Sequence, residues 1–429
     1  MEKLREWKNS DERKPLILKG ARQVGKTWLM REFGRIDFDD FVYLNFDGNS
    51  QLSEIFSIDI SPSTLIPKLE ILSGKKIIPD KTLIIFDEVQ EVPRALSSLK
   101  YFCEDAPEYH IVAAGSLLGI ALHPGTSFPV GKVSFLDISP MTFKEFLIAT
   151  GQDHLANTLC IDNLNLLKVL KDKYELALKT YYYVGGMPEV VSNFVNNQNF
   201  EEVRQIQKNI LNAYEQDFSK HAPGNVVPKI RDVWTSIPSQ LAKENKKFVY
   251  GLIRQGARAK EFEHAIMWLK DCGLVHQVGR VTSFNYPPAF YKDLKAFKLF
   301  FVDVGLLSRL SDVSPASIIE GDRLLTEYKG ALTEQYVAQE LLAACRKDLY
   351  YYTNDRNTCE IDFVGNYFGK TVPIEVKASK NMKAKSLKTV IDKYGLGIAI
   401  RSSLNDFEEN LPIVNVPLYA MSLLHELEF

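Results

Sequence analysis

The sequence predicts an α/β protein of several domains, beginning with a parallel β-sheet that carries helices on both faces. Three observations support this prediction. A chain of 429 residues is too long to fold around one hydrophobic core. Short apolar runs alternate with helical patterns up to about residue 145, which is the order of a parallel sheet. The pattern then becomes helical, and a later helix followed by three strand-like runs indicates a second α/β region.

Five apolar runs are the expected strands of the first sheet. The third of them is apolar throughout until two carboxylates end it, as expected of a buried parallel strand whose C-terminal end opens on a ligand site. The expected strands are Pro15–Lys19, Phe41–Phe46, Thr82–Glu88, His110–Gly115 and Lys132–Ile138.

The segment GARQVGKT, residues 20–27, follows the first of these strands directly and continues as the helical pattern WLMREFG. Gly20 and Gly25 let the backbone turn tightly, so that consecutive N–H groups converge on phosphates at the positive end of the helix. Lys26 would reach the terminal phosphates and Thr27 would ligate magnesium. A glycine-containing turn with a solvated lysine is the alternative, and the flanking strand and helix argue against it.

Asp87 and Glu88, which end the third strand, complete this expected phosphate site. Asp87 would hold Mg²⁺ and Glu88 would orient and deprotonate the attacking water, so Glu88 and Lys26 are the catalytic candidates. A solvated acidic turn is the alternative. Ser116 follows the fourth strand and could sense the terminal phosphate, or serve equally well as a helix N-cap. The nucleotide-binding candidates are Gly20, Ala21, Arg22, Gln23, Val24, Gly25, Lys26, Thr27, Trp28, Asp87 and Ser116.

Several segments together resemble the prokaryotic AAA-type ATPases that carry a C-terminal domain of unknown function with a restriction-endonuclease-like pattern. They are GARQVGKT, IIFDEVQ, AAGSLL, ISPMTFKEFL, YYYVGGMPEVV, WLKDCGLV and FVDVGLL. The resemblance implies ATP as the nucleotide, with Mg²⁺, and a sensor role for Ser116. Relatives tend to have arginine where this chain has Lys132, which lacks the planar fork of arginine. Arg94, Arg22 and Lys132 all stay open as the group that completes a neighbour's site.

The middle of the chain is expected to hold a helical lid and a winged-helix-like domain. The stretch Asn225–Lys260 has eight basic and two acidic residues, so it could contact nucleic-acid phosphates. A solvated helical face explains the same residues. The expected domains are an AAA-type ATPase domain (1–145), a helical lid (146–224), a winged-helix-like domain (225–310) and a nuclease-like domain (311–429).

Charged residues in the C-terminal strand-like runs predict a second site. Asp362 lies inside an apolar strand, and strand alternation points Glu375 and Lys377 to one face. This pattern, preceded by the helical Glu334, resembles the PD-(D/E)XK nucleases. By that resemblance Asp362 and Glu375 hold Mg²⁺, Glu334 assists, and Lys377 positions or activates the attacking water. The competing interpretation is a structural ion pair of Lys377 in a fold that does not cleave.

Composition sets the remaining expectations. Lys and Arg number 52 against 54 Asp and Glu, so nucleic acid would have to bind local patches, such as the seven lysines within residues 366–393. The five cysteines have no metal-ligand spacing, and the charged N-terminal stretch predicts a cytoplasmic protein. The predicted function is an ATP-hydrolysing switch or motor coupled to a nuclease-like domain that acts on DNA. The alternative is an ATP-gated signalling or scaffolding protein that binds a protein partner or a second copy of itself.

Overall fold

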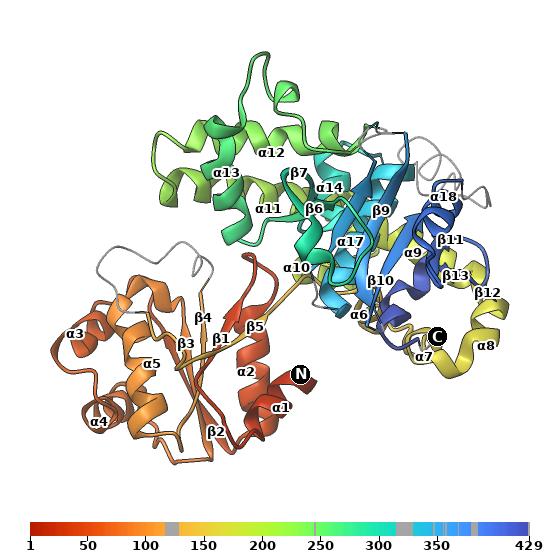
Figure 1. The fold of residues 1–429 in the computed structure, drawn as a ribbon. Helices are drawn as coiled ribbons and strands as arrows, with labels where there is room; N and C mark the ends of the chain where they lie inside the picture. The colour runs from red at the N-terminus through yellow and green to blue at the C-terminus, as the bar shows by residue number, and fades with distance from the viewer. Residues whose placement is uncertain are drawn as a thin grey trace. The chain divides into compact units, whose positions relative to one another are not determined.

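The computed structural model describes residues 1–115, 128–243, 246–314, 329–345, 348–354, 356, 358–367, 369–378 and 385–427. The chain divides into two compact units, which are described separately (Figure 1). The first contains Met1–Ser139 with Asp271–Gly273, and the second contains Pro140–Lys270 with Leu274–Phe429.

A five-stranded sheet forms the centre of the first unit. Its order is β2-β3-β4-β1-β5 and every pairing is parallel, which confirms the predicted parallel sheet. The strands are β1 (Leu16–Lys19), β2 (Asp40–Asn45), β3 (Thr82–Asp87), β4 (His110–Ala114) and β5 (Ser134–Asp137). Because all five run in the same direction, the residues that follow β1, β3 and β4 meet at one edge of the sheet.

Helices cover both faces of this sheet (Figure 1). Alternate residues of β3 divide between two hydrophobic cores, with Ile84 and Phe86 in one and Leu83 and Ile85 in the other. This alternation follows from the two-residue period of a strand. The helices are α1 (Glu2–Lys8) and α2 (Lys26–Asp37), which pack on the second core, and α3 (Ser50–Ile58), α4 (Pro62–Ser73) and α5 (Pro93–Asp105), which pack on the first.

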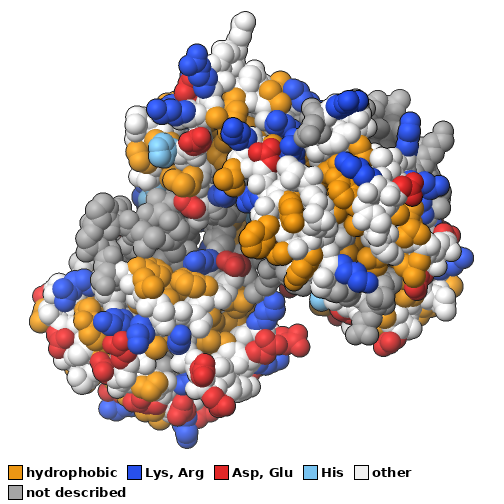
Figure 2. All heavy atoms as spheres, in the orientation of Figure 1, with side chains coloured by type: hydrophobic (Ala, Val, Ile, Leu, Met, Phe, Trp, Pro, Cys, Tyr) orange, Lys and Arg blue, Asp and Glu red, His pale blue; other side chains and the backbone are white. Residues whose placement is uncertain are grey.

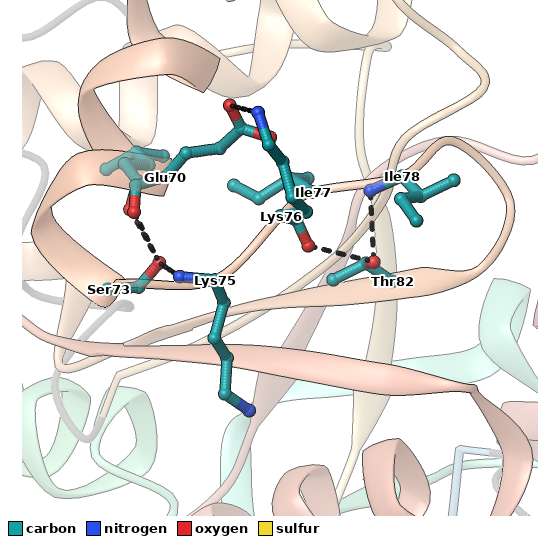
Figure 3. A network of polar contacts seen from close by, with 8 residues as sticks. Glu70, Ser73, Lys75, Lys76, Ile77, Ile78 and Thr82 are labelled. Atoms are coloured by element: carbon teal, nitrogen blue, oxygen red, sulfur yellow. Dashed lines mark hydrogen bonds and ion pairs between the residues drawn. The ribbon is translucent and has the colours of Figure 1, made fainter.

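A polar network fixes where β3 begins (Figure 3). Glu70, near the end of α4, accepts a hydrogen bond from the backbone N–H of Ile77 at 2.9 Å and lies 3.4 Å from the Lys76 ammonium. The hydroxyl of Thr82 accepts from the N–H of Ile78 at 3.0 Å. These contacts hold the connection against both α4 and the first residue of β3. The register of β3 itself is seen in its parallel pairing with β2 and β4.

The second unit contains an eight-stranded mixed sheet with the order β12-β13-β11-β10-β9-β8-β6-β7 among the described residues. Its strands are β6 (Val275–Val281), β7 (Lys292–Phe301), β8 (Tyr350–Thr353), β9 (Glu360–Tyr367), β10 (Lys370–Val376), β11 (Ala399–Ser403), β12 (Glu408–Asn410) and β13 (Ile413–Pro417). The strands β6 and β8 pair in parallel, so the middle region and the C-terminal region share one sheet. The domain divisions expected at residues 225 and 311 stay predictions, as do the winged-helix and restriction-endonuclease-like identities.

Helices make up the rest of the second unit. They are α6 (Phe143–Ala149), α7 (Asp153–Thr158), α8 (Leu164–Val169), α9 (Lys171–Val184), α10 (Pro188–Asn197), α11 (Phe200–His221), α12 (Val227–Leu241), α13 (Ala259–Asp271), α14 (Val304–Leu310), α17 (Lys329–Cys345) and α18 (Lys385–Tyr394). The second unit also has the short 3₁₀ helices η2 (Ile161–Asn163), η3 (Tyr250–Leu252), η4 (Pro288–Tyr291) and η5 (Leu418–His425), and the first unit has η1 (Val89–Glu91). No helix in the described part of the chain has the length and apolar character needed to cross a membrane.

Two of the sequence motifs meet in a buried polar junction of the second unit. The carboxylate of Asp303, from FVDVGLL, accepts hydrogen bonds from the N–H groups of Gly186 at 2.7 Å and Leu306 at 2.9 Å. Burial raises the pKa of Asp303 to about 6, against the effect of these N–H groups. A side chain at Gly185, from YYYVGG, would place its Cβ 2.2 Å from Asp303 Oδ1. The motifs therefore have a packing role here.

Candidate functional site

The glycine-rich loop of the first unit has the backbone conformation that its sequence requires. Gly20 has φ 143° and Gly25 has φ 90°, and Gly25 is the N-cap of α2. A Cβ at Gly20 would lie 2.1 Å from the carbonyl oxygen of Ile138, which follows β5. Only glycine fits this position without displacing backbone. Gln23, with φ 64°, is a second residue of the loop in the left-handed region.

Lys26 is folded into the loop that precedes it. Its ammonium donates to the carbonyl oxygens of Gly20 at 2.8 Å and Ala21 at 2.7 Å, and its side chain is buried. Burial lowers the pKa of Lys26 to about 8, although the nearby carboxylates of Glu88 and Asp87 act in the opposite direction. The lysine is thus held among hydrogen-bond acceptors at the N-terminus of α2, where phosphate oxygens bind in proteins with such loops.

Thr27 and Asp87, two of the predicted site residues, lie in contact at the edge of the sheet. The Thr27 hydroxyl donates to Asp87 Oδ2 at 2.7 Å, and Asp87 is buried. A hydroxyl and a carboxylate are oxygen donors that suit Mg²⁺, which keeps several waters in addition to a few protein ligands. The pair therefore fits the magnesium ion that a nucleoside triphosphate carries.

Tyr43 is a member of this site that sequence reasoning missed. Its hydroxyl donates to the same oxygen of Asp87 at 2.8 Å, and burial together with the Asp87 carboxylate raises the pKa of the phenol. The Arg31 guanidinium lies 4.9 Å from the centre of the Tyr43 ring. No pattern in the sequence predicts this contact directly, because the contact depends on β2 lying next to β3.

Glu88 follows Asp87 in an unusual backbone conformation. Its φ of 52° lies in the left-handed region, which is uncommon for a non-glycine residue and occurs often at functional sites. The Gln90 side-chain amide donates to Glu88 Oε2 at 2.6 Å, and the Glu88 N–H donates to Asp87 Oδ1 at 3.1 Å. The backbone turn and Gln90 together fix the direction of the Glu88 carboxylate. The string IIFDEVQ contains Gln90, but nothing in its spacing predicts this role.

The structure describes some of the other nucleotide-binding candidates but not all of them. Ala21 and Val24 are buried within the loop, while 67% of Trp28 is exposed. Ser116 lies outside the described residues. Lys132, a candidate to complete a neighbour's site, pairs with Glu104 at 2.8 Å. Arg94, another such candidate, donates to the backbone carbonyl of Phe56 at 2.7 Å. The identity of a residue that completes a neighbour's site stays a prediction.

The second predicted site lies on β9 and β10 of the other unit, which pair antiparallel. Asp362 Oδ2 accepts a hydrogen bond from the Val376 N–H at 2.7 Å. Glu375 Oε1 lies 2.9 Å from the Lys377 ammonium, whereas its second oxygen is buried and has no hydrogen-bond partner among the described residues. The three residues that sequence reasoning grouped therefore occupy adjoining positions on neighbouring strands.

Glu334 joins this region from α17 but has cationic partners that the sequence did not predict. Lys246, in the connection between α12 and η3, forms an ion pair with Glu334 Oε1, and both side chains are buried. Lys298, from β7, is fully buried and lies 3.7 Å from Glu334 Oε2 and 2.5 Å from Glu360 Oε1. A lysine inside the apolar run FKLFFVD was the available signal for Lys298, because a buried charge requires a partner.

Burial and neighbouring charges shift the pKa values of Asp362, Glu334 and Lys298. Burial raises the pKa of Asp362 to about 7, and the Glu334 carboxylate adds to the shift. For Glu334, burial is outweighed by Lys246 and Lys298, which lower its pKa. Burial likewise opposes the charge of Lys298, but Glu334 and Glu360 more than compensate and raise its pKa. Glu334 and Lys298 are therefore held in their charged forms.

The fit of this cluster to a metal ion is partial. The described residues contain no group of three or more His, Cys, Asp or Glu placed to hold a metal. Asp362 and Glu375 provide two carboxylates on adjoining strands, and the unpartnered oxygen of Glu375 is a donor that a divalent cation would satisfy. Glu334 already has two ammonium partners. Metal binding by Asp362 and Glu375 thus stays a prediction that the donor chemistry supports.

Comparison with known protein families gives a class for the first unit. Residues 12–147 match a family model described as an AAA domain. Together with the loop, the parallel sheet and the Thr27–Asp87 contact, this match defines the first unit as a P-loop AAA-type ATPase domain that binds ATP. Residues 175–317 and 329–421 match two models, each described as a domain of unknown function (DUF8612 and DUF4143). No curated protein matches the chain.

Among solved structures, the chain is similar to a Walker-type ATPase of Pyrococcus abyssi. The identity is 15% and the TM-score 0.44, over 72% of this chain and 95% of the other. It is also similar to Cdc6p from Pyrobaculum aerophilum, with 14% identity and a TM-score of 0.25, over 74% and 91% of the two chains. At these TM-scores neither likeness carries a functional argument.

Proposed function

We propose that this chain is a Mg²⁺-dependent ATP hydrolase that works as a molecular switch or motor. The observation that carries the proposal is the 2.7 Å hydrogen bond between the Thr27 hydroxyl and Asp87, with Glu88 next in the chain. A loop lysine, a metal-binding hydroxyl, a metal-binding carboxylate and a base are the groups that phosphoryl transfer to water requires. All four groups lie in the first unit: Lys26 and Thr27 begin α2, and Asp87 and Glu88 stand at the end of β3.

Each residue has a separate task in the proposed reaction. Lys26 exchanges its bonds to loop carbonyls for bonds to the terminal phosphates, which neutralises their charge. Thr27 and Asp87 would hold Mg²⁺, which would neutralise the negative charge that develops on the phosphates. Glu88 accepts the proton of the attacking water, and Gln90 keeps its carboxylate pointed in one direction. Tyr43 orients Asp87 by donating to the oxygen that also accepts from Thr27.

Replacement of the loop lysine tests the binding part of this proposal. Lys26→Ala is expected to weaken binding of ATP·Mg²⁺ at least about tenfold, because a charge-assisted contact to the phosphates is worth more than about 1.4 kcal/mol. Fluorescence titration with a labelled ATP analogue measures the change. Lys81→Ala is the matched control, since Lys81 is an exposed lysine of the same unit. Equal affinities of the two variants would contradict the assignment.

The second unit has a second candidate function, metal-dependent cleavage of a DNA phosphodiester. The buried, unpartnered oxygen of Glu375 favours it, with Lys377 2.9 Å from the other oxygen. Asp362 and Glu375 would hold a divalent ion, which polarises a phosphate when bound, and Lys377 would position the attacking water. The exposed Lys370, Lys385 and Lys388 supply charge for a DNA backbone, whereas Lys380 and Lys383 lie outside the described residues.

The competing proposal for the second unit is a non-cleaving role in signalling or scaffolding. The ion pairs of Glu334 with Lys246 and Lys298 favour it, because carboxylates that are already neutralised need no metal. Incubation of single- and double-stranded DNA with Mg²⁺ separates the two proposals. Cleavage by the wild-type protein that Asp362→Asn abolishes supports the nuclease, while no cleavage and a strongly destabilised Asp362→Asn support the structural role.

A further inference from the structure

The connection between β6 and β7 presents large apolar side chains to solvent. Tyr286 is 57% exposed and Phe290 is 84% exposed, and Leu294, near the start of β7, is also 84% exposed. Single apolar residues are common on protein surfaces, but several that lie together in one short segment indicate an interaction site. We call this connection, residues 282–291, the β6–β7 loop.

The β6–β7 loop is held in place by contacts at its base. The Thr282 N–H donates to the Tyr291 carbonyl oxygen at 3.0 Å, which closes the loop. The ring of Phe284 is buried, and its centre lies 4.7 Å from that of Tyr352 on β8. The exposed rings therefore extend from an anchored backbone, and a ligand that covers them has to order little of the chain.

Lysines flank the exposed rings. Residues 282–296 include Lys292 and Lys295, both at exposed positions, and one acidic residue, Asp293. Asp293 is already engaged, because one carboxylate oxygen lies 3.3 Å from Arg280 Nε and the other accepts from the Lys295 N–H at 2.9 Å. The side chains of this segment that face solvent are therefore apolar or positively charged.

A third lysine joins the same loop from β10. The Thr371 hydroxyl donates to the Asn285 carbonyl oxygen at 3.2 Å, so the start of β10 lies against the loop. Lys370, the first residue of β10, is exposed. We define the loop surface as the exposed apolar and lysine side chains of these segments. Its members are Tyr286, Phe290, Leu294, Lys292, Lys295 and Lys370.

The edge of the sheet beside the loop surface is poorly suited to an added peptide strand. β7 is the last strand in the sheet order among the described residues. Its register with β6 shifts next to the Gly279–Phe297 pair, and residues 294–296 have no partner on β6. The Phe248 N–H also donates to the Phe297 carbonyl oxygen at 2.8 Å. A bulged and partly occupied edge disfavours strand addition, so a ligand has to bind the side chains.

We infer that the loop surface binds single-stranded nucleic acid. Each nucleotide of a single strand carries a flat base and a negative phosphate, which match aromatic rings and lysines on one surface. An acidic peptide provides negative charge without a ring at every residue. Tyr286 and Phe290 would be stacking platforms for bases, and the three lysines would face the phosphates. The inference requires neither ATP hydrolysis nor DNA cleavage by the second unit.

Fluorescence anisotropy of labelled oligothymidylate and oligouridylate strands with the full chain tests the inference. Mg²⁺ and ATP are left out, so that neither cleavage nor hydrolysis contributes. Combined Tyr286→Ala and Phe290→Ala should weaken binding by about tenfold or more, because two stacking platforms are lost. The two strands distinguish DNA from RNA as the tighter ligand.

The salt dependence of the same binding tests the lysines. Combined Lys292→Ala, Lys295→Ala and Lys370→Ala should lower the slope of log affinity against log salt by about 2, since each phosphate contact on a single strand contributes about 0.7. Lys173→Ala, at an exposed position on α9, is the control and should keep the slope of the wild type.

Val169→Ala is the control for the aromatic variant, because Val169 is 78% exposed on α8 of the same unit. It should bind both strands as the wild type does. Equal affinities of the wild type and the aromatic variant, or no binding of either strand by the wild type, would overturn the inference. Sedimentation with anionic phospholipid vesicles that only the aromatic variant loses, without oligonucleotide binding, would replace nucleic acid by a membrane surface.

Discussion

Glu340 is a buried carboxyl group whose ionisation should control the stability of the second unit. It lies on α17, has no exposed surface, and accepts a hydrogen bond from the Phe143 N–H at 2.8 Å through Oε1. Burial raises the pKa of Glu340 from 4.5 to about 8, and the charge of Glu145 adds to the shift. Its second oxygen is buried without a hydrogen-bond partner among the described residues, so the Phe143 N–H offsets only part of the cost of the charged form.

The sign of the pH dependence follows from this shift. Between pH 4.5 and about 8 the folded protein binds a proton at Glu340 that the unfolded chain has released. The contribution of this group is therefore fully present below the unfolded pKa and is lost as the pH rises through the folded pKa. From about pH 5 to about pH 7.5 the loss is about 3 kcal/mol in free energy of unfolding, since one pKa unit corresponds to about 1.4 kcal/mol.

Glu340→Gln should remove this loss, because the amide keeps an acceptor for the Phe143 N–H and has no charge. Urea unfolding of the variant and the wild type across this pH range measures the difference. The variant should be more stable than the wild type near pH 7.5 and nearly equal to it near pH 5. Glu408→Gln, at an exposed position, is the control. Parallel stability curves for Glu340→Gln and the wild type would refute the reasoning.

Two further predictions concern the glycine-rich loop of the first unit and the basic stretch Asn225–Lys260. Gly20→Ala should abolish measurable nucleotide binding and cost about 1–3 kcal/mol of stability, because its Cβ would meet the Ile138 carbonyl at 2.1 Å; wild-type affinity in a nucleotide titration would contradict this. Combined Arg254→Ala, Arg258→Ala and Lys260→Ala, all at exposed positions, should lower the salt slope of DNA binding by about 3 if this surface contacts phosphates. An unchanged slope leaves the solvated-face interpretation.

The basic stretch Asn225–Lys260 forms a smaller exposed surface than its sequence suggests. Lys246, one of the eight basic residues of the stretch from 225 to 260, is buried against Glu334 and does not contribute to it. On the face drawn in Figure 2, basic and acidic side chains are interspersed, in keeping with a formal net charge of −2. A count of charges along the sequence cannot distinguish a buried ion pair from an exposed patch.

The strands and loops of the first unit could be predicted from sequence because each is specified by a short, continuous segment. Apolar runs that end in GARQVGKT or in Asp87–Glu88 specify both a strand and the group at its end, and the parallel sheet is confirmed. The strand order could not be read in the same way, so the contact of Tyr43 with Asp87 was missed. It depends on which strands become neighbours after folding.

The second unit was harder to predict for the same physical reason. The sequence correctly placed Asp362 and Glu375 on adjoining strands, since strand periodicity is a local property. The pairing of β6 with β8 joins strands about 70 residues apart in the chain, and the Lys246–Glu334 ion pair spans 88 residues. Contacts of such long range are set by packing of the whole sheet and leave little trace in any one segment.

The most direct test of the proposed ATP hydrolase is turnover by Glu88→Gln. The variant should bind ATP·Mg²⁺ with an affinity close to that of the wild type, because Lys26, Thr27 and Asp87 are unchanged. Its steady-state release of phosphate should fall by about 100-fold or more, the usual loss when a general base is removed. Glu91→Gln, at a nearby exposed position, should retain wild-type turnover. Phosphate release by Glu88→Gln at the wild-type rate would contradict the assignment of Glu88 as the base.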